Sequence, residues 1–237
     1  MNTIIKGKTF LTGDQRAELQ WSWPEIKKKL RIRMVDTETA KESPRFRNSL
    51  RKDFDCGLSA ILTVRLSEDS GNKVRYSLYT NVLHNIFGIT DDELFRCAMS
   101  NCMQTDAAIF MLMDSALLAF GKPPVNLLTR NSNETVSADD FYVLTTESGI
   151  FGANTILYEH CGMSLLERIG YIIGENYYLL PSSIHELIIL PVSTSHTVEE
   201  LSEMVKDVNR RLVSERNFLS DHVFFFDREK KALTVAL

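Results

Sequence analysis

The chain of 237 residues lacks the short motifs that mark common phosphate-binding loops and catalytic serines. It contains no G-x-x-x-x-G-K-[ST] and no G-x-G-x-x-G segment, so the glycine loops of P-loop and dinucleotide-binding folds are absent. A G-x-S-x-G nucleophile elbow and a glycine-rich oxyanion loop are also missing. These absences argue against the most easily recognised nucleotide-binding and hydrolase architectures.

Cysteine is scarce and unsuitably spaced for a metal. The chain has four cysteines, Cys56, Cys97, Cys102 and Cys161. A structural zinc site combines two closely spaced pairs of ligands, whereas Cys97 and Cys102 form a single pair inside an expected helix. We therefore expect buried structural cysteines, no metal site and no cofactor.

Long apolar runs are absent as well. The longest, Ala107 to Phe120, is interrupted by Asp114 and is shorter than the ~20 residues that span a bilayer. Met1 to Thr12 lacks the apolar stretch of a secretory signal. We expect a cytoplasmic protein with reduced thiols and no membrane partner.

Positive charge is concentrated in one segment of an acidic chain. Residues 25–52 hold ten Lys or Arg against four Asp or Glu, although the formal net charge of the whole chain is -4. Such a segment suits an electrostatic partner, and nucleic acid is a candidate because Trp21, Trp23 and Phe46 offer rings for base stacking. The alternatives are a solvated basic face and a segment docked on the acidic remainder. The expected binding residues are Lys27, Lys28, Lys29, Arg31, Arg33, Arg45 and Arg47.

Helix caps and strand alternation predict the elements of the N-terminal half. Leu30 to Val35 alternates apolar and basic residues, which predicts a half-exposed strand. Thr105 to Phe120, rich in Met and Phe, predicts a buried helix that ends at Gly121. The other expected elements are helices at 15–23, 25–30 and 91–101 and a hairpin of strands at 58–66 and 73–80.

The C-terminal half predicts short strands connected by hairpins and separated by helices. Tyr177 to Val192 reads as two apolar strands joined through Pro181, Ser182 and Ser183. The other expected elements are strands at 141–146, 150–158, 223–226 and 232–235 and helices at 161–173 and 197–212.

This order favours an α+β fold with a mostly antiparallel sheet, helices packed on one face and a helical basic N-terminal extension. The expected division is a basic segment at 1–55 and an α+β domain at 56–237, with a possible sub-division near 122–140.

Potentially reactive side chains are densest near the Pro-Ser break. A hydrolase would use Ser183 as nucleophile, His185 as base and Asp221 to orient the base. The structural alternative, which we favour, is that these polar residues satisfy backbone groups at a bulge and a turn. Further candidates are Ser182, Glu186 and His222.

Several motifs of the chain resemble an uncharacterised bacterial family known only as a domain of unknown function. They are, in order, NVLHNIFGITDDELFRCAMSN, FYVLTTESGIFGANTILY, YYLLPSSIHELIILPV, TVEELSEMVKDVN and LSDHVFFFDRE. The resemblance runs from about Leu30 to the C-terminus, and a second uncharacterised bacterial family is more distantly similar. It implies an intracellular bacterial protein, often associated with mobile elements, and it supplies no catalytic set or ligand.

The leading hypothesis is therefore a non-enzymatic interaction protein that acts on a protein or nucleoprotein partner. One version is a mobile-element-encoded modulator of a host defence or nucleic-acid system. The alternatives are the hydrolase described above and a small-molecule sensor with an apolar pocket near Met111 and Met113.

Overall fold

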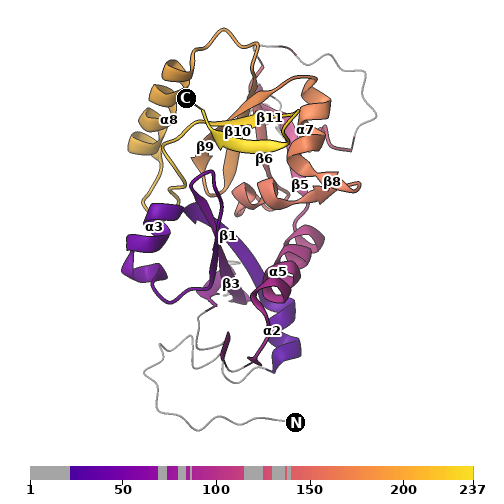
Figure 1. Cartoon of the computed structure of the whole chain (residues 1–237), viewed down its shortest axis with the longest axis vertical. Helices are drawn as coiled ribbons and strands as arrows, with labels where there is room; N and C mark the ends of the chain where they lie inside the picture. Colours follow the sequence, from indigo (N-terminus) through magenta and orange to yellow (C-terminus); the bar gives the residue numbers. More distant parts are fainter. Residues whose placement is uncertain are drawn as a thin grey trace.

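The computed structural model describes residues 22–68, 74–79, 84–85, 87–114, 125–129, 137 and 140–236. Their helices and mostly antiparallel strands make an α+β protein, as the sequence predicted. Figure 1 shows two sheets stacked along the long axis, the smaller one below and the larger one above. Most of the helix expected at 15–23 lies outside the described residues.

The smaller sheet is built around one long strand, β3. Its strands are β1 (Leu30–Asp36), β2 (Arg51–Asp53), β3 (Leu58–Glu68) and β4 (Val74–Leu78). The β3 strand pairs antiparallel with all three others, and the expected hairpin of β3 and β4 is confirmed. The β1 strand pairs with β3 from Leu30 opposite Val64 to Asp36 opposite Leu58. Residues on either side of position 55 therefore share one sheet and one hydrophobic core.

Two helices cover the apolar face of β1. They are α2 (Trp23–Lys29), with Pro24 in its first turn, and α5 (Asp91–Thr105), whose first turn is capped by the Thr90 hydroxyl. Leu30, Ile32 and Met34 belong to the core that these helices share. The side-chain amide of Asn101 donates to the carbonyls of Lys27 and Leu30, which fastens α5 to the end of α2.

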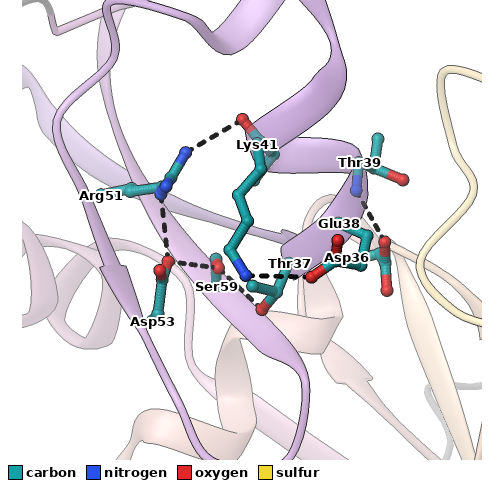
Figure 2. A network of polar contacts seen from close by, with 9 residues as sticks. Asp36, Thr37, Glu38, Thr39, Lys41, Arg51, Asp53 and Ser59 are labelled. Carbon is teal, nitrogen blue, oxygen red and sulfur yellow. Dashed lines mark hydrogen bonds and ion pairs between the residues drawn. The ribbon is translucent and has the colours of Figure 1, made fainter.

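A short helical segment covers the opposite face of β1 at one end. It consists of α3 (Thr37–Glu42) and the 3₁₀ helix η1 (Pro44–Phe46). Figure 2 shows the polar network beside it: Arg51 Nε pairs with Asp53 at 3.1 Å, and the Ser59 hydroxyl donates to Asp53 at 2.7 Å. Lys41 pairs with Glu38 in the same network. Two of the basic residues of segment 25–52 are thus neutralised locally.

The larger sheet is antiparallel throughout, with strand order β12-β11-β9-β10-β6-β5. The expected hairpin at its C-terminal edge is confirmed. The strands are β5 (Ala108–Leu112), β6 (Tyr142–Thr146), β9 (Tyr177–Ser183), β10 (Glu186–Pro191), β11 (Phe224–Asp227) and β12 (Ala232–Val235). Two strands of two residues each, Glu159–His160 (β7) and Met163–Ser164 (β8), form a separate small ladder.

Helices cover both faces of the larger sheet, not one face as the sequence predicted. On one side α7 (Leu165–Ile173) shares a core with Tyr177 and Leu179 of β9. On the other side α8 (Val198–Leu212) packs against Leu180 of the same strand. Because β9 has apolar residues at consecutive positions, each of its faces needs a cover. The α8 helix begins at the expected place, whereas α7 begins four residues after its expected start; each has a capping box.

Two predictions of secondary structure are wrong. Ala108–Leu112, expected in a helix, is the strand β5, because α5 ends at Thr105 and the following apolar run pairs with β6. A short apolar run has no period that separates helix from strand. Residues 150–158, expected as a strand, contain the 3₁₀ helix η2 (Gly152–Leu157).

The Pro-Ser break lies inside a strand and does not end it. Pro181 to Ser183 belong to β9, and the turn to β10 is made by Ile184 and His185. The register shifts between Glu186, which is opposite Ser183, and Leu187, which is opposite Pro181. Ser182 is therefore the extra residue of a β-bulge.

Within the described ranges, no helix is long and apolar enough to cross a membrane.

Candidate functional site

Asn154 of η2 joins the free edge of β1 to the larger sheet. Its side-chain oxygen accepts from the amide of Met34 at 3.0 Å, and its side-chain nitrogen donates to the carbonyl of Ile32 at 2.5 Å. The amide of Ile32 donates to the sulfur of Cys102. Side chains thus complete the ladder of an edge strand that has no strand partner on that side. The arrangement fixes β1 in the seam between the two sheets.

The basic residues of β1 are buried in this seam. Arg31 is 8% exposed and Arg33 is 9% exposed, so β1 is not the half-exposed strand that its alternation predicted. The structure buries both faces because α2 and α5 cover one side and the seam covers the other. Lys and Arg are rarely buried to this degree without a charged partner.

Arg31 is held by backbone groups alone. Its Nη1 donates to the carbonyls of Lys28 at 3.0 Å and Leu30 at 2.8 Å. None of the carboxylates in the described ranges forms an ion pair with it. Removing a guanidinium charge from water costs several kcal/mol unless a counter-charge is supplied. Arg31 is therefore a cation whose partner the described chain does not provide.

Arg33 is in the same situation at the other end of the seam. Its Nη2 donates to the carbonyl of Arg216, while its Nε is buried without a hydrogen-bond partner. The guanidinium lies 5.9 Å from the ring centroid of Phe46 and 5.7 Å from that of Phe151. Burial, with a smaller effect from the charge of Arg45, lowers the pKa of Arg33 to about 10. The group keeps its charge at neutral pH.

Two adjoining cavities open beside Arg31 and share it. The outer cavity, of about 360 Å³, is lined by Lys28, Lys29, Arg31, Arg65 and Leu66. The inner cavity, of about 110 Å³, begins at the same two arginines and extends between the sheets to Tyr158 and Asn154. We call the two together the cationic cleft. No carboxylate among the described residues lines its outer part.

The inner cavity is rich in hydroxyl groups. Tyr76, Thr105, Ser148 and Tyr158 line it together with the carboxylate of Asp106. Burial raises the pKa of Tyr76, and the nearby charges of Arg65 and Arg31 lower it. Burial also raises the pKa of Tyr158, so both phenols stay protonated and can donate at neutral pH.

Cys102 closes the inner cavity as a neutral thiol. Burial is the main cause that raises its pKa, and the thiol is 4% exposed. Because the thiolate is the reactive form, this environment does not favour nucleophilic chemistry. Cys97 lies half-buried on the same helix, and the described part of the chain has no group of His, Cys, Asp and Glu that could hold a metal ion.

The seven expected binding residues do not form one continuous surface. Lys27 and Lys28 of α2 are exposed and Lys29 is half-buried, whereas Arg31 and Arg33 are buried. Arg45 and Arg47 are exposed at η1, and Figure 1 shows α3 and α2 on opposite sides of the smaller sheet. The cationic cleft combines the α2 lysines with Arg31 and Arg65.

Within the described part of the chain, the segment meets the acidic remainder mostly through contacts other than ion pairs. Among the described residues, the ion pair that links residues 25–52 to the rest of the chain joins Arg51 to Asp53. The contact is instead made by β-pairing and by apolar burial.

The rings proposed for base stacking are not available as expected. Phe46 is buried between the guanidinium groups of Arg33 and Arg45. Trp23 is half-buried, with its ring 5.7 Å from that of Phe87. Trp21 lies outside the described residues. Phe46 is therefore excluded as a platform for base stacking. The cleft presents positive charge and hydroxyl groups to a ligand.

The three residues of the expected hydrolase site are each occupied elsewhere. The Ser183 hydroxyl accepts from the backbone amide of His185, and the His185 Nδ1 accepts from the backbone amide of Phe151 at 3.2 Å. Asp221 is exposed and accepts from the side chain of Asn209 at 2.8 Å. No contact of these described residues joins the Ser183 hydroxyl to the His185 ring, or His185 to Asp221.

The remaining candidates have local roles. The Ser182 hydroxyl donates to Glu186 at 2.9 Å across the bulge. His222 is exposed, and its backbone amide donates to the Ser220 hydroxyl. These contacts fit the alternative in which the polar residues satisfy a bulge and a turn.

Two other hollows lie on the larger sheet. A groove of about 340 Å³ between α8 and the sheet is mostly apolar and includes Met113, Ile188 and Met204, with Ser182 and Glu186 among its few polar residues. A wider hollow, of about 650 Å³, lies beside α7, where Glu167 pairs with Lys231 and Glu175 accepts from Ser193.

Sequence reasoning missed the residues that complete the cleft. Arg65 and Tyr76 meet through the pairing of β3 with β4, whereas Asp106 and Tyr158 come from two other segments that the fold brings to them. One signal was present: Arg65 interrupts an apolar strand, and its cross-strand neighbour is Tyr76. No sequence pattern marked Phe151 as a residue of the cleft. Its φ of 56° is unusual for a residue other than glycine.

The fold and the cleft define an α+β protein of two antiparallel sheets with the buried arginines Arg31 and Arg33 between them. The chain belongs to a family of unknown function, DUF5688, whose model matches residues 5–228. The match begins well before Leu30 and so includes N-terminal residues that the motif resemblance left out. Neither a curated protein nor a solved structure matches the chain.

Proposed function

We propose that the protein is a non-enzymatic interaction protein that binds an acidic macromolecular partner, a protein or a nucleoprotein, at the cationic cleft. The observation that carries this proposal is the burial of Arg31 without a carboxylate partner among the described residues, beside the exposed Lys27 and Lys28. A buried cation that forms no ion pair among the described residues gains the most when a partner supplies the opposite charge.

Catalysis is the less supported alternative. Proton transfer needs a nucleophile and a base within hydrogen-bond reach, and the Ser183 hydroxyl instead contacts the backbone of His185. The proposal extends to a cytoplasmic bacterial setting and to a mobile-element-encoded modulator of a host defence or nucleic-acid system. Those settings rest on the motif resemblance.

The direct test neutralises the exposed lysines and leaves the buried arginines intact. A triple variant, Lys27→Gln, Lys28→Gln and Lys29→Gln, is compared with wild type for binding to fluorescent polyglutamate and to a fluorescent single-stranded oligonucleotide. We expect the triple variant to lose at least about tenfold in affinity for an acidic polymer, because each lost cation removes a favourable long-range interaction.

The matched control removes the same charge elsewhere. Lys206→Gln, Lys230→Gln and Lys231→Gln neutralise three exposed lysines of the larger-sheet half, each of which pairs with a carboxylate. Exposed pairs contribute little to stability, so this control keeps its fold. Equal affinities for wild type, triple variant and control would contradict the proposal.

The apolar groove beside α8 supports a second candidate, a small-molecule sensor. Its volume lies within the range of ligand pockets, and Met113 was one of the residues expected to line such a site. Met111 is instead buried in β5. A thermal-shift screen of apolar ligands tests the groove, and the absence of any stabilising compound counts against a sensor.

A further inference from the structure

We propose that the inner cavity of the cationic cleft binds the terminal phosphate of a nucleic acid strand whose backbone follows the lysines of α2. This inference rests on the proposed function, because it names the acidic partner that the same cleft would bind. It goes beyond that function by assigning a ligand group to Arg31, Arg65 and Tyr76.

The size of the cavity selects a single compact group. Its 110 Å³ corresponds to the liquid volume of about four water molecules. Ligand pockets for drug-sized molecules begin at about 300 Å³, so a base with its sugar does not fit. A bridging phosphate would need room for the chain on both sides, whereas a terminal phosphate needs it on one side only.

The donors of the cavity match the oxygens of a phosphate. Arg31 is oriented by two backbone carbonyls that bind its Nη1, which leaves its other donors without a partner among the described residues. A guanidinium held in this way forms bidentate, charge-assisted bonds with phosphate. Arg65 lines the same cavity, and the protonated hydroxyl of Tyr76 lies close to both charges. A carboxylate ligand would use fewer of these donors because it has two oxygens where a terminal phosphate has three.

Asp106 is the one acid among the described residues that line the cavity, and its oxygens are already engaged. Oδ1 accepts from the amide of Ser148 at 2.9 Å, and Oδ2 accepts from the Ser148 hydroxyl at 2.5 Å. These bonds hold the loop after β6 against the end of α5 and direct the carboxylate toward that loop. The negative charge of Asp106 repels an anion in the cavity, and the positive charges of Arg31 and Arg65 offset this repulsion.

The surface outside the cavity favours nucleic acid over a phosphorylated protein. Lys27, Lys28 and Lys29 follow one another on α2, and two of them also line the outer cavity. A polymer with a phosphate at every repeat can contact these lysines and the inner cavity together, whereas one phosphorylated side chain fills the cavity only. Lys28 and Lys29 therefore extend the cationic site beyond the inner cavity.

The test compares oligonucleotides that differ only at their ends. Fluorescence anisotropy measures the binding of wild type to one single-stranded oligonucleotide with a 5′-phosphate, with a 3′-phosphate, or with two hydroxyl ends. A hydroxyl-ended strand one nucleotide longer controls for the added charge. We expect one of the two terminal phosphates to raise the affinity about tenfold, the size of a gain from charge-assisted hydrogen bonds.

Two variants connect that gain to the cavity. Arg31→Gln removes the guanidinium, and Tyr76→Phe removes one hydroxyl with little change of shape. Tyr171→Phe, at an exposed position of α7, is the matched control. The preference for the phosphorylated end should disappear in Arg31→Gln, shrink in Tyr76→Phe and persist in the control. If Arg31→Gln fails to fold, the comparison of Tyr76→Phe with the Tyr171→Phe control still tests whether the terminal phosphate binds in the cavity.

The outcomes separate this inference from the proposed function. Equal binding of all four oligonucleotides, with loss in the α2 triple variant, overturns the terminal-phosphate site and leaves the acidic-partner proposal standing. Binding of a phosphopeptide through Arg31, without binding of any oligonucleotide, overturns the assignment to nucleic acid. Failure of every acidic polymer to bind overturns both.

Discussion

Gly152 lies where two backbone segments leave no room for a side chain. A Cβ at this position would overlap the carbonyl oxygen of His185 and come within 2.6 Å of the Thr145 hydroxyl. The Thr145 hydroxyl donates to that same carbonyl at 2.8 Å, so neither neighbour can move away freely. Gly152 therefore sets the distance between η2 and the larger sheet, and with it the position of Asn154 two residues later.

Replacing Gly152 with alanine should destabilise the protein strongly. We expect Gly152→Ala to lower the free energy of unfolding by about 3 kcal/mol, at the upper end of overpacking penalties, because backbone atoms must shift. Denaturant unfolding measures the change. Gly170→Ala is the matched control, since its Cβ would meet only the flexible side chain of Arg228 and alanine favours a helix. A similar loss in both variants would contradict this account.

At the residue scale, the sequence predicted which basic residues belong to the binding site better than it predicted whether they are buried. Lys27, Lys28 and Arg31 were expected to bind a partner, and the structure places Lys28 and Arg31 in one cleft. The alternation of Leu30 to Val35 suggested that Arg31 and Arg33 face water, but the stacked larger sheet covers them. A period-two pattern identifies the two faces of a strand and carries no information on what lies over the polar one. That cover comes from residues more than a hundred positions away.

At the scale of elements, β1 depends on a side chain that replaces a strand. Asn154 is 3% exposed and bonds to both the Met34 amide and the Ile32 carbonyl. Its carboxamide supplies one donor and one acceptor, which matches what an edge strand lacks. The smaller sheet and η2 are held together at this point, and the inner cavity is formed beside it.

Asn154→Asp tests this attachment with almost no change in volume. The aspartate oxygen would face the Ile32 carbonyl, and the new charge would be buried. We expect a loss of at least about 3 kcal/mol in the free energy of unfolding, because a donor is lost and an uncompensated charge is created. Asn48→Asp, at an exposed position, is the control and should change stability by no more than about 0.5 kcal/mol. Equal thermal and denaturant midpoints for the two variants would contradict the role of Asn154.

The elements themselves were largely predictable, with exceptions that have a common cause. The helices α7 and α8 begin at Ser164 and Thr197, whose capping boxes are local signals. By contrast, Ala108–Leu112 is apolar throughout, so its strand conformation follows from pairing with β6 and not from its own pattern. The 3₁₀ helix η2 similarly follows from long-range contacts such as those of Gly152 and Asn154.

At the scale of the whole molecule, tyrosines support the core that spans both sheets. Tyr79, Tyr142 and Tyr177 are almost fully buried and belong to one hydrophobic core with β1, β3 and β9. Burial is the main cause that raises the pKa of each, and the charge of Asp91 adds to this at Tyr79. Tyr177 also donates to the carbonyl of Leu166 at 2.9 Å.

These tyrosines predict a loss of stability in alkali. Unfolded tyrosines ionise near pH 10, whereas the buried ones stay protonated to higher pH, so above about pH 10 the folded state binds more protons than the unfolded state. Their contribution is fully present below about pH 10 and declines as the pH rises further. The measurement is the melting temperature at pH values from 8 to 11, with the phenolate absorbance recorded in the same samples. The melting temperature should fall above about pH 10.

The three buried tyrosines should ionise only when the protein unfolds, so their phenolate absorbance should rise together with the loss of structure. Full phenolate formation without a change in circular dichroism would be incompatible with the burial of these rings.

The stacking of two sheets was the least predictable feature. Hairpin connections indicated an antiparallel α+β fold, and both sheets are antiparallel. The sequence contains no local signal for the division of the strands between two sheets, because β3 of one sheet and β9 of the other are both strongly apolar. The cationic cleft exists only as a consequence of that division, which is why Arg65 and Tyr158 could not be assigned to it beforehand.

The salt dependence of binding measures the central claim most directly. Binding of a single-stranded oligonucleotide releases counterions in proportion to the phosphates contacted, at about 0.7 in the logarithmic slope for each. If all three lysines of α2 contact phosphates, the triple variant should show a slope shallower by about 2 than wild type, while the Lys206, Lys230 and Lys231 control keeps the wild-type slope. Identical slopes for all three proteins would contradict a cationic cleft that binds an acidic polymer.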